Sequence, residues 1–269
     1  MVTGAGAGIG RATALALARQ GVTVAVCDLD ERSAKEAAGA IVAAGGRASA
    51  HRVDVSSEEE MRGLVAEVLG EHGAVDIVVN NAGIAGPTMP TEDVPLERFH
   101  KVVDVNFWGV VHGSVAFLPH LKTRPAANLV NVSSNAGIMA YSRMAPYNAS
   151  KFAVRGFTET LRMELRSTPV RVTVVCPGVT GTSMLAHSPV IDEADRTAMQ
   201  ARFDRTWTNK PEKVAGAIVN AIRKDKPRAL VGPDTAAIDA IVRLLPGGHS
   251  RLLAKPIDLV LAQALGKRA

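Results

Sequence analysis

Short valine-rich runs alternate along this chain with longer amphipathic segments, and the alternation continues over most of its length. The runs predict strands at 22–28, 47–53, 75–80, 128–133, 170–176 and 228–232. The amphipathic segments predict helices at 9–20, 31–44, 57–72, 95–121 (bent or broken), 145–167 and 211–225. Apolar runs without polar alternation are typical of strands buried on both faces. The order therefore predicts an α/β fold, a doubly wound parallel sheet covered by helices on both sides.

The beginning of the chain departs from this pattern, because only Met1 and Val2 precede a glycine-rich turn. A doubly wound sheet needs a strand of about five residues there, at its centre. We therefore expect either a very short first strand or a natural start further upstream. A protein expressed from Met1 is expected to be less stable than one extended upstream.

A length of 269 residues favours one large domain over two small ones. The net charge is +5, and residues 223–269 carry all of the excess, with nine Lys or Arg against four Asp or Glu. We predict a domain over 1–232 and a basic helical extension over 233–269, with helices at 236–245 and 257–265. The extension has three open roles: docking on a subunit neighbour or over the cleft, a peripheral membrane contact, or binding another protein. Nucleic-acid binding has only charge in its favour, since the extension lacks aromatic residues.

Three absences bound the class of protein. No apolar run reaches the roughly 18–20 residues that span a bilayer, and no secretory signal is visible. Cys27 and Cys176 each end a valine-rich run, which predicts buried thiols. The seven histidines show no metal-ligand spacing, so no metal site is predicted. We therefore expect a cytoplasmic protein.

The glycine-rich turn at 3–10 predicts a phosphate site. Gly4, Gly8 and Gly10 allow positive φ and a close approach of the backbone to a pyrophosphate, and Ile9 begins a helix whose N-terminus attracts it. Asp28 ends the next strand, eighteen residues after Gly10. A carboxylate there accepts hydrogen bonds from an adenosine ribose and repels a 2′-phosphate. The two features indicate a dinucleotide site that prefers NAD.

Tyr147 and Lys151 lie four residues apart in a predicted helix, so their side chains share one face. An ammonium beside a phenol favours the phenolate and is expected to lower the pKa of Tyr147 from about 10 toward neutrality. Such a tyrosine acts as a general acid or base. Many helices contain Tyr-x-x-x-Lys by chance, so a surface pair is the alternative explanation of this spacing alone.

In chain order, several motifs resemble those of the short-chain dehydrogenase/reductase family over about residues 1–232. They are the glycine turn, Asn80-Asn81-Ala82-Gly83, Asn106, Ser134, the Tyr147/Lys151 pair and the segment 177–182. The resemblance implies a single-domain Rossmann fold with a catalytic set of Asn106, Ser134, Tyr147 and Lys151. Asn106 would hold a water in a proton relay, which is compatible with a buried amide bonding the backbone of a kinked helix.

Within the implied catalytic set, Ser134 would position the substrate oxygen and Tyr147 would transfer the proton. Lys151 would assist Tyr147 and hydrogen-bond the nicotinamide ribose. Ser133 is the rival of Ser134, but the thirteen-residue spacing to Tyr147 favours Ser134.

The resemblance also implies how the cofactor is held. Asp54 would bind the adenine and Val55 would pack on its ring. For Asn81, direct contact with the cofactor and a purely structural role are equally open. The residues expected to bind NAD are Gly4, Gly8, Ile9, Gly10, Asp28, Asp54, Val55, Asn81, Ala82, Gly83, Tyr147, Lys151, Pro177, Gly178, Val179 and Thr182.

The implied function is an NAD-dependent oxidoreductase that moves hydride between nicotinamide and a secondary alcohol or ketone. Residues 183–210 are expected to form a substrate lid. The apolar side chains of this lid, with those of Ile84, Met89, Met139 and Met144, favour a lipophilic substrate. Reduction of an acyl-thioester or enoyl substrate and a non-catalytic dinucleotide-binding sensor or scaffold are the alternatives. The family also implies a homo-oligomer, a dimer or homotetramer, that pairs the helices at 95–121 and 145–167.

Overall fold

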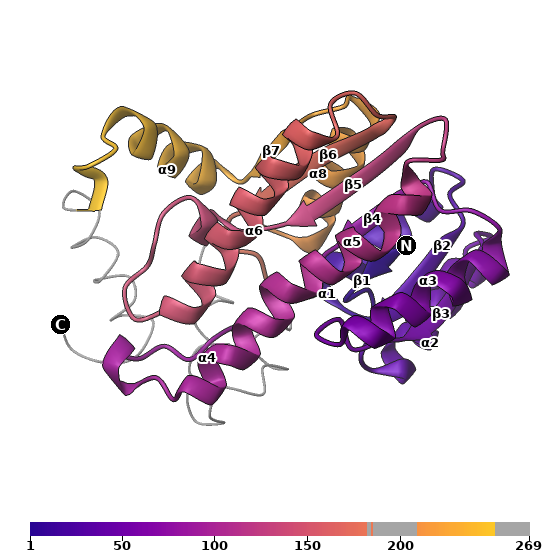
Figure 1. Cartoon of the computed structure of the whole chain (residues 1–269), viewed down its shortest axis with the longest axis horizontal. Helices are drawn as coiled ribbons and strands as arrows, with labels where there is room; N and C mark the ends of the chain where they lie inside the picture. Colours follow the sequence, from indigo (N-terminus) through magenta and orange to yellow (C-terminus); the bar gives the residue numbers. More distant parts are fainter. Residues whose placement is uncertain (182–183, 185–208, 251–269) are drawn as a thin grey trace.

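The computed structural model describes residues 1–181, 184 and 209–250. Within these ranges, seven parallel strands form one sheet in the order β3-β2-β1-β4-β5-β6-β7 (Figure 1). The strands are β1 (Val2–Thr3), β2 (Val24–Asp28), β3 (Ala48–Arg52), β4 (Ile77–Asn80), β5 (Ala127–Val132), β6 (Val170–Pro177) and β7 (Arg228–Val231). The chain moves outward from β1 to β3 and then from β4 to β7 on the other side. This is the doubly wound Rossmann topology that the sequence predicts.

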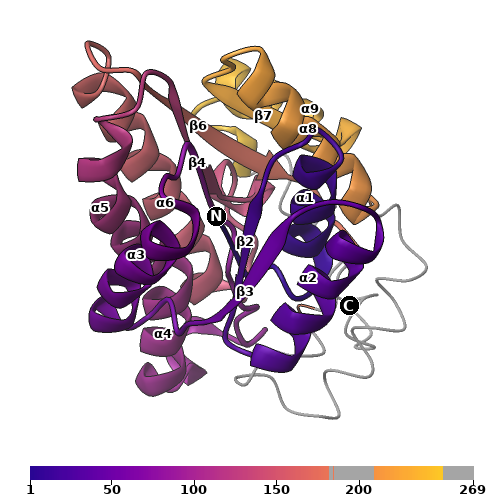
Figure 2. The ribbon, with the colours of Figure 1, turned by 90° about the vertical axis from the view of Figure 1, so that its right-hand side faces the viewer.

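Helices cover both faces of the sheet, which Figure 2 shows nearly edge-on. One layer contains α1 (Gly8–Ala18), α2 (Glu31–Ala43) and α8 (Pro211–Arg223), and the other contains α3 (Glu58–His72), α4 (Leu96–Val103), α5 (Gly109–Leu121) and α6 (Ala145–Glu164). Asp30 and Ser57 cap the N-termini of α2 and α3 by accepting hydrogen bonds from Arg32 and Glu60.

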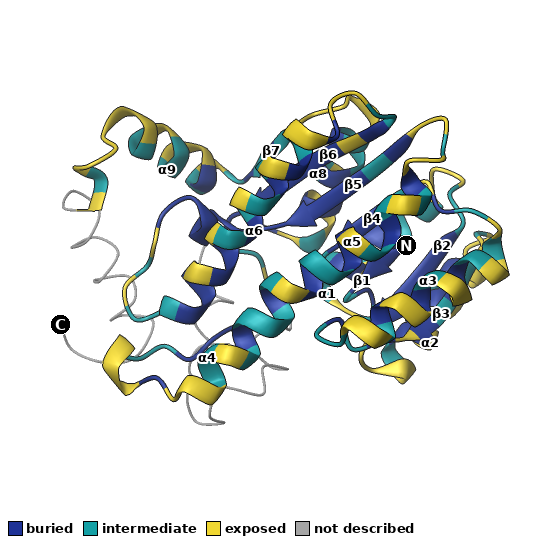
Figure 3. Cartoon of the chain, viewed as in Figure 1, coloured by how far each residue is buried: buried dark blue, intermediate teal, exposed yellow. Residues whose placement is uncertain are grey.

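The inner strands are buried because both of their faces pack against helices, as the dark centre of Figure 3 shows, whereas the edge strands β3 and β7 alternate between buried and partly exposed residues. On one face, Val26 and Val130 pack in a cluster with side chains of α1, α2 and α8, including Leu17 and Ile218. On the other face, Leu129 packs in a second cluster with side chains of α3, α5 and α6. The prediction of strands buried on both faces from valine-rich runs is therefore confirmed for the inner strands.

The central strand β1 is as short as its sequence suggests. Val2 pairs with Val26 of β2 and with Val79 of β4, so β1 joins the two halves of the sheet. The carbonyl of Met1 also accepts a hydrogen bond from the N–H of Val79, at 3.0 Å.

The predicted helix over 95–121 is broken, as expected. A π-helical turn, η2 (Asp104–Trp108), separates α4 from α5. Contrary to the expectation from the sequence, Leu96–Leu121 as one run of 26 residues is long and apolar enough to cross a membrane by length and composition. Core helices of soluble proteins pass the same test, and 44% of the apolar window is buried inside the fold.

The first helix of the basic extension is α9 (Pro233–Leu244), close to the predicted 236–245. Its Ile238 and Val242 pack against a small cluster that contains Val174 and Cys176. Arg228 of β7 donates two hydrogen bonds to the carboxylate of Asp239, at 3.0 and 2.6 Å. The second predicted helix, 257–265, lies outside the described residues, and the division at residue 232 stays a prediction.

Candidate active site

The predicted site residues converge at one edge of the sheet, where the parallel strands have their carboxyl ends. The glycine turn follows β1, Asp28 ends β2, and Asn81 follows β4 directly. Ser134 comes just after β5, and Pro177 ends β6. Ligands of doubly wound sheets bind at this edge, so the topology alone makes it the candidate site.

The glycine turn has the shape of a phosphate cradle. Gly4 and Gly8 have φ values of 60° and 51°, which favour glycine. A Cβ on Gly10 would lie 2.0 Å from the carbonyl oxygen of Gly4, so no larger residue fits there. Ala7 provides no side-chain cap for α1, and the first turn of α1 has no acidic residue. The first N–H groups of α1 are therefore left for an anionic ligand, which fits a pyrophosphate.

Asp28 is fixed by two backbone hydrogen bonds. Its Oδ2 accepts from the N–H of Gly6 at 2.8 Å, and its Oδ1 accepts from Asp30 at 3.1 Å. A Cβ on Gly6 would lie 3.0 Å from the same carboxylate and 2.6 Å from Ser33 Cβ. Gly6 was not among the predicted cofactor-binding residues, although it lies in the glycine turn. It links the turn to the carboxylate that would face the ribose.

Asn81 has a structural role in this arrangement. Its side-chain amide donates to the carbonyls of Thr3 and Gly4, at 2.9 and 3.2 Å. The hydroxyl of Thr3 in turn accepts from the backbone N–H groups of Asn81 and Ala82. The alternative of a structural contribution, which the sequence left open, is therefore supported, and Thr3 is a site residue that the sequence prediction missed.

Asp54 and Val55, which the family resemblance implies at the adenine, follow β3 directly. Ser56 donates to Asp54 Oδ1 from both its backbone N–H and its hydroxyl, at 2.9 and 2.6 Å. Although partial burial acts to raise the pKa of the Asp54 carboxyl, these hydrogen bonds and Lys101 hold that pKa below its usual value. Val55 is buried and packs on Gly109, where a Cβ would lie 2.7 Å from its side chain. Contact of either side chain with a cofactor stays a prediction.

Tyr147 lies in the first turn of α6, beside Ser134. Both side chains are buried, and a hydrogen bond joins Ser134 to the phenol. The hydroxyl of Ser133 instead donates to the carbonyl of Lys151 at 2.8 Å, and it occupies the space that a Cβ on Gly137 would need. The structure therefore places Ser134, rather than its rival Ser133, next to the phenol.

The pKa of Tyr147 differs from the sequence-based expectation. Burial raises it above its ordinary value, and the hydrogen bond between the phenol and Ser134 only partly opposes this effect. Lys151 Nζ lies 5.8 Å from the centroid of the Tyr147 ring and donates to the carbonyl of Val132 at 3.2 Å. Burial also lowers the pKa of Lys151, from 10.5 to about 8. Burial therefore sets the direction of the Tyr147 shift, and the amine of Lys151 does not lower the pKa of the phenol as was expected.

Asn106 lies in the π-helical turn η2, a type of irregularity that is frequent at functional sites. Its Oδ1 accepts from the N–H of Ile84 at 2.7 Å, and its amide donates to the Ile84 carbonyl at 3.0 Å and to Ser150 Oγ at 3.2 Å. A Cβ on Gly83 would lie 3.1 Å from Asn106 Oδ1 and 3.4 Å from Lys151 Nζ. Asn106 is thus the buried amide that the sequence allowed, and it borders Lys151 across Gly83.

The turn after β6 is held by a residue that the sequence analysis missed. The carboxylate of Asp234, in the first turn of α9, accepts from the N–H of Val179 at 3.3 Å. A Cβ on Gly178 would lie 2.1 Å from that carboxylate, so the turn requires glycine. The sequence signal for Asp234 is the pair Gly232-Pro233, which marks a helix start and places an acidic residue in the first turn of that helix. Thr182 and nearly all of the predicted lid over 183–210 lie outside the described residues.

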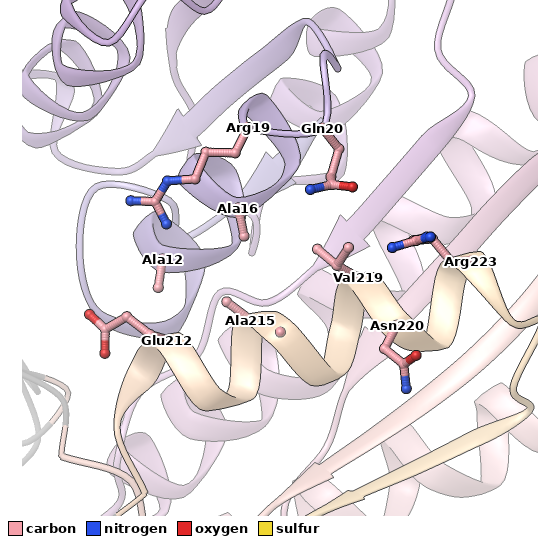
Figure 4. A pocket seen from close by; sticks show the side chains of 10 residues that line it. Ala12, Ala16, Arg19, Gln20, Glu212, Ala215, Val219, Asn220 and Arg223 are labelled. Carbon is pink, nitrogen blue, oxygen red and sulfur yellow. The ribbon is translucent and has the colours of Figure 1, made fainter.

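A surface groove lies between α1 and α8, away from this edge (Figure 4). Ala12 and Ala16 face Ala215 and Val219 across it, and Arg19, Gln20, Asn220 and Arg223 lie at its end. None of its lining residues is a predicted catalytic or cofactor-binding residue. The candidate active site is therefore the strand-end arrangement and not this groove.

Comparison with known proteins agrees with the site geometry. The family model described as short chain dehydrogenase matches residues 1–190. The chain is 42% identical over 253 residues to a probable oxidoreductase, EphD, of Mycobacterium tuberculosis, and the match covers 91% of the chain but only 43% of that protein. It is also 32% identical over 225 residues to a cyclohexanol dehydrogenase of Acinetobacter sp. (strain SE19), which covers 84% of the chain and 87% of that enzyme.

Solved structures share the fold. A short-chain dehydrogenase/reductase from Burkholderia phymatum in complex with NAD has a TM-score of 0.84 and 29% identity, covering 91% of this chain and 92% of its own. A metagenomic short-chain oxidoreductase in complex with NADP has a TM-score of 0.71 and 28% identity, covering 86% and 94%. Similar structures therefore include complexes with either dinucleotide.

Proposed function

Since the chain belongs to the short-chain dehydrogenase/reductase family, we propose that it is an NAD-dependent dehydrogenase that interconverts a lipophilic secondary alcohol and its ketone. The observation that carries the proposal is the contact of the buried Tyr147 phenol with Ser134, one helical turn from the buried amine of Lys151. A non-catalytic dinucleotide sensor would have no use for this set of buried polar groups.

The chain's own groups divide the chemistry between them. Ser134 donates a hydrogen bond to the substrate oxygen and holds it next to Tyr147. Tyr147 takes the proton of an alcohol during oxidation and returns it to the oxygen during ketone reduction. Lys151 stabilises the phenolate and binds the ribose hydroxyls beside it. The nicotinamide, when bound, accepts or supplies the hydride at its C4.

The preference for NAD over NADP rests on Asp28. Its carboxylate is held at the mouth of the glycine turn by Gly6, with remaining lone pairs available to the two ribose hydroxyls. A 2′-phosphate at the same place would meet a fixed negative charge. The expected cofactor is therefore NAD.

The Asp28→Asn variant tests this assignment. Asparagine keeps the acceptor for the N–H of Gly6 but loses the charge, so the ratio of kcat/KM with NAD to that with NADP is expected to fall about 10- to 100-fold. Asp30→Asn is the matched control, because Asp30 caps α2 and asparagine caps equally well. An unchanged cofactor ratio in Asp28→Asn would remove the basis of the NAD proposal.

The lipophilic substrate class is supported by the walls next to Tyr147. The loops after β4 and β5 are joined by a hydrogen bond from the N–H of Met89 to the carbonyl of Arg143, at 3.0 Å. These loops bring Ile84, Met139 and Met144 to the same end of the sheet, and Met139 is buried. The similarity to a cyclohexanol dehydrogenase is in line with this class of substrate.

Turnover is the direct test of the function. The purified protein is supplied with NAD or NADP and a panel of cyclic and linear secondary alcohols, and with the reduced cofactors and a panel of ketones, enoyl compounds and acyl-thioesters. Reduced nicotinamide is followed by absorbance in both directions. The proposal expects oxidation of apolar alcohols with NAD and the reverse reaction with the ketones. Activity only on enoyl or acyl-thioester substrates would replace the proposed function with the alternative reductase.

Homo-oligomerisation and a cytoplasmic location stay proposals. Trp108 and Val115 of the η2–α5 region and Phe152 and Met163 of α6 are exposed apolar side chains, which give a second copy an apolar surface to cover.

A further inference from the structure

A second group of polar residues lies away from the candidate active site, between the edge strand β3 and helix α3. The β3–α3 cluster consists of Ser49 and His51 on β3 and Glu67, Glu71 and His72 on α3. Ser49 Oγ lies 2.6 Å from His51 Nε2 and 2.7 Å from His72 Nε2. None of the five residues is a predicted catalytic or cofactor-binding residue. The cluster therefore needs an explanation of its own.

Local structure brings these side chains together. Ser49 and His51 are two residues apart on a strand, so both point to the same face, and both are buried. Glu67 and Glu71 lie one turn apart on α3, and His72 is its last residue. Figure 1 shows α3 and β3 close together at the edge of the sheet, and the hydrogen bond between Glu67 and His51 joins them. The two imidazoles come from different elements far apart in the sequence, which is why their spacing gave no signal.

The hydrogen bonds orient the imidazole of His51 as in a metal ligand. Its Nδ1 lies 2.9 Å from Glu67 Oε1. An ionised carboxylate only accepts, so Nδ1 carries a proton, and in the neutral ring the Nε2 lone pair faces the Ser49 hydroxyl, 2.6 Å away. A carboxylate behind one ring nitrogen and an unprotonated nitrogen on the other side of the ring is the arrangement found around metal-bound histidines.

The charges of the cluster also favour a cation. Glu67 and Glu71 lie in the last two turns of α3, where the helix end itself carries partial negative charge. Among the described residues, neither carboxylate forms an ion pair with Lys or Arg, and both contact only His51 in this way. The carboxylates of Glu67 and Glu71 repel each other because they lie one turn apart. A cation bound beside the imidazoles would reduce this repulsion.

From these contacts we infer that His51, His72 and Glu71 bind a divalent ion of the zinc class. Their ligand atoms all lie within 4.8 Å of one another, and His51 Nε2 is 3.8 Å from Glu71 Oε2. Ligand atoms of a tetrahedral zinc site lie about 3.4 Å apart, so the exposed side chain of Glu71 and the partly exposed His72 need only small rotations. The Ser49 hydroxyl or a water supplies the fourth ligand, and Glu67 orients His51.

Two imidazoles and one carboxylate suit zinc better than calcium or magnesium, which prefer oxygen ligands alone. The bound ion would fasten the edge strand to the end of α3. It would stabilise the strand whose continuation carries Asp54, without entering the reaction.

The test uses the tag-free chain of residues 1–269 after treatment with a chelator. Zinc is added at known concentration, and its binding is followed by calorimetry and by metal analysis after dialysis. The expected result is one zinc ion per chain with micromolar or tighter affinity. Cobalt added in its place is expected to give the visible absorption bands of a tetrahedral site. A hundredfold excess of zinc over Kd is expected to raise the melting temperature by about 5 °C or more.

Variants separate this site from adventitious binding. His72→Gln and Glu71→Gln change partly or fully exposed side chains, so the fold should survive, and both are expected to abolish saturable binding and the cobalt bands. Glu67→Gln is expected to weaken zinc about 10- to 100-fold by releasing the orientation of His51. His100→Gln, an exposed histidine on α4, is the control and should bind like the unchanged protein. Absence of saturable zinc binding, or binding that survives His72→Gln, would overturn the proposal.

Discussion

Replacing Tyr147 by phenylalanine is expected to reduce kcat/KM for alcohol oxidation by about 10²- to 10⁴-fold, the range that general acid–base catalysis contributes. The change removes one oxygen atom from a buried side chain and leaves the ring in place. The affinity for NAD, measured by fluorescence titration or calorimetry, should change less than the rate, because the ring and Lys151 remain.

The chain contains one other tyrosine, Tyr141, which makes Tyr141→Phe a matched control. Tyr141 is joined to Asn148 through its backbone N–H and carbonyl, so removal of its hydroxyl leaves these contacts intact. We expect it to keep most of the activity. A Tyr147→Phe enzyme with near-normal turnover, or equal losses in both variants, would refute the role of Tyr147.

The role of Tyr147 also predicts how the rates of oxidation and reduction depend on pH. Oxidation requires the phenolate, and burial raises the pKa of Tyr147 in the cofactor-free protein. The rate of alcohol oxidation should therefore rise with pH from neutrality upward, whereas ketone reduction, which requires the phenol, should not. A pH profile of kcat/KM in both directions measures this, and Tyr147→Phe should remove the rising limb.

Replacing Lys151 by methionine is expected to have two opposite effects. Turnover should fall about 10²- to 10³-fold, since the phenolate loses its cation. The free energy of unfolding at pH 7 should rise by about 1–2 kcal/mol. The lowered pKa of the buried amine, about 8 against 10.5, corresponds to a folding cost of about 3 kcal/mol, and about 1 kcal/mol is lost with the hydrogen bond to Val132. Lys151 thus reduces stability in exchange for function.

The sign of this stability effect depends on pH in a defined way. Below pH 8 the amine is protonated in both the folded and the unfolded chain, and the folded state bears the full cost of burial. Between pH 8 and 10.5 the folded chain has released the proton while the unfolded chain still holds it, so the unchanged protein gains stability as pH rises. The advantage of Lys151→Met should therefore shrink above pH 8, vanish about 1 to 1.5 pH units higher, and be reversed near pH 10.5.

Thermal unfolding over pH 7 to 10.5 measures both effects. The melting temperature of Lys151→Met should exceed that of the unchanged protein by about 2–6 °C at pH 7. Lys122→Met, at an exposed position, is the control and should shift it little. A less stable Lys151→Met protein at pH 7 would show that contacts of the amine outweigh the cost of its burial.

The sequence by itself determined the layout of the fold and the order of the site. Valine-rich runs between amphipathic helices specified a parallel sheet, because the local pattern of apolar residues predicts which faces of each element are buried. In such a sheet the carboxyl ends of the strands meet at one edge. This topology therefore brings together the glycine turn, Asp28, Ser134 and the helix of Tyr147 at that edge.

Tertiary structure alone decided which polar groups are in contact and how far each is buried from solvent. The choice of Ser134 over Ser133, the anchoring of Gly178 by Asp234 and the contact of Gly6 with Asp28 depend on distances between segments far apart in sequence. The pKa of Tyr147 moved against the expectation because of burial, which no spacing reveals and which the hydrogen bond with Ser134 only partly opposes. The approach of His51 to His72 depends likewise on how one helix packs beside one edge strand. Local patterns encode elements, whereas contacts and desolvation arise only when the elements pack.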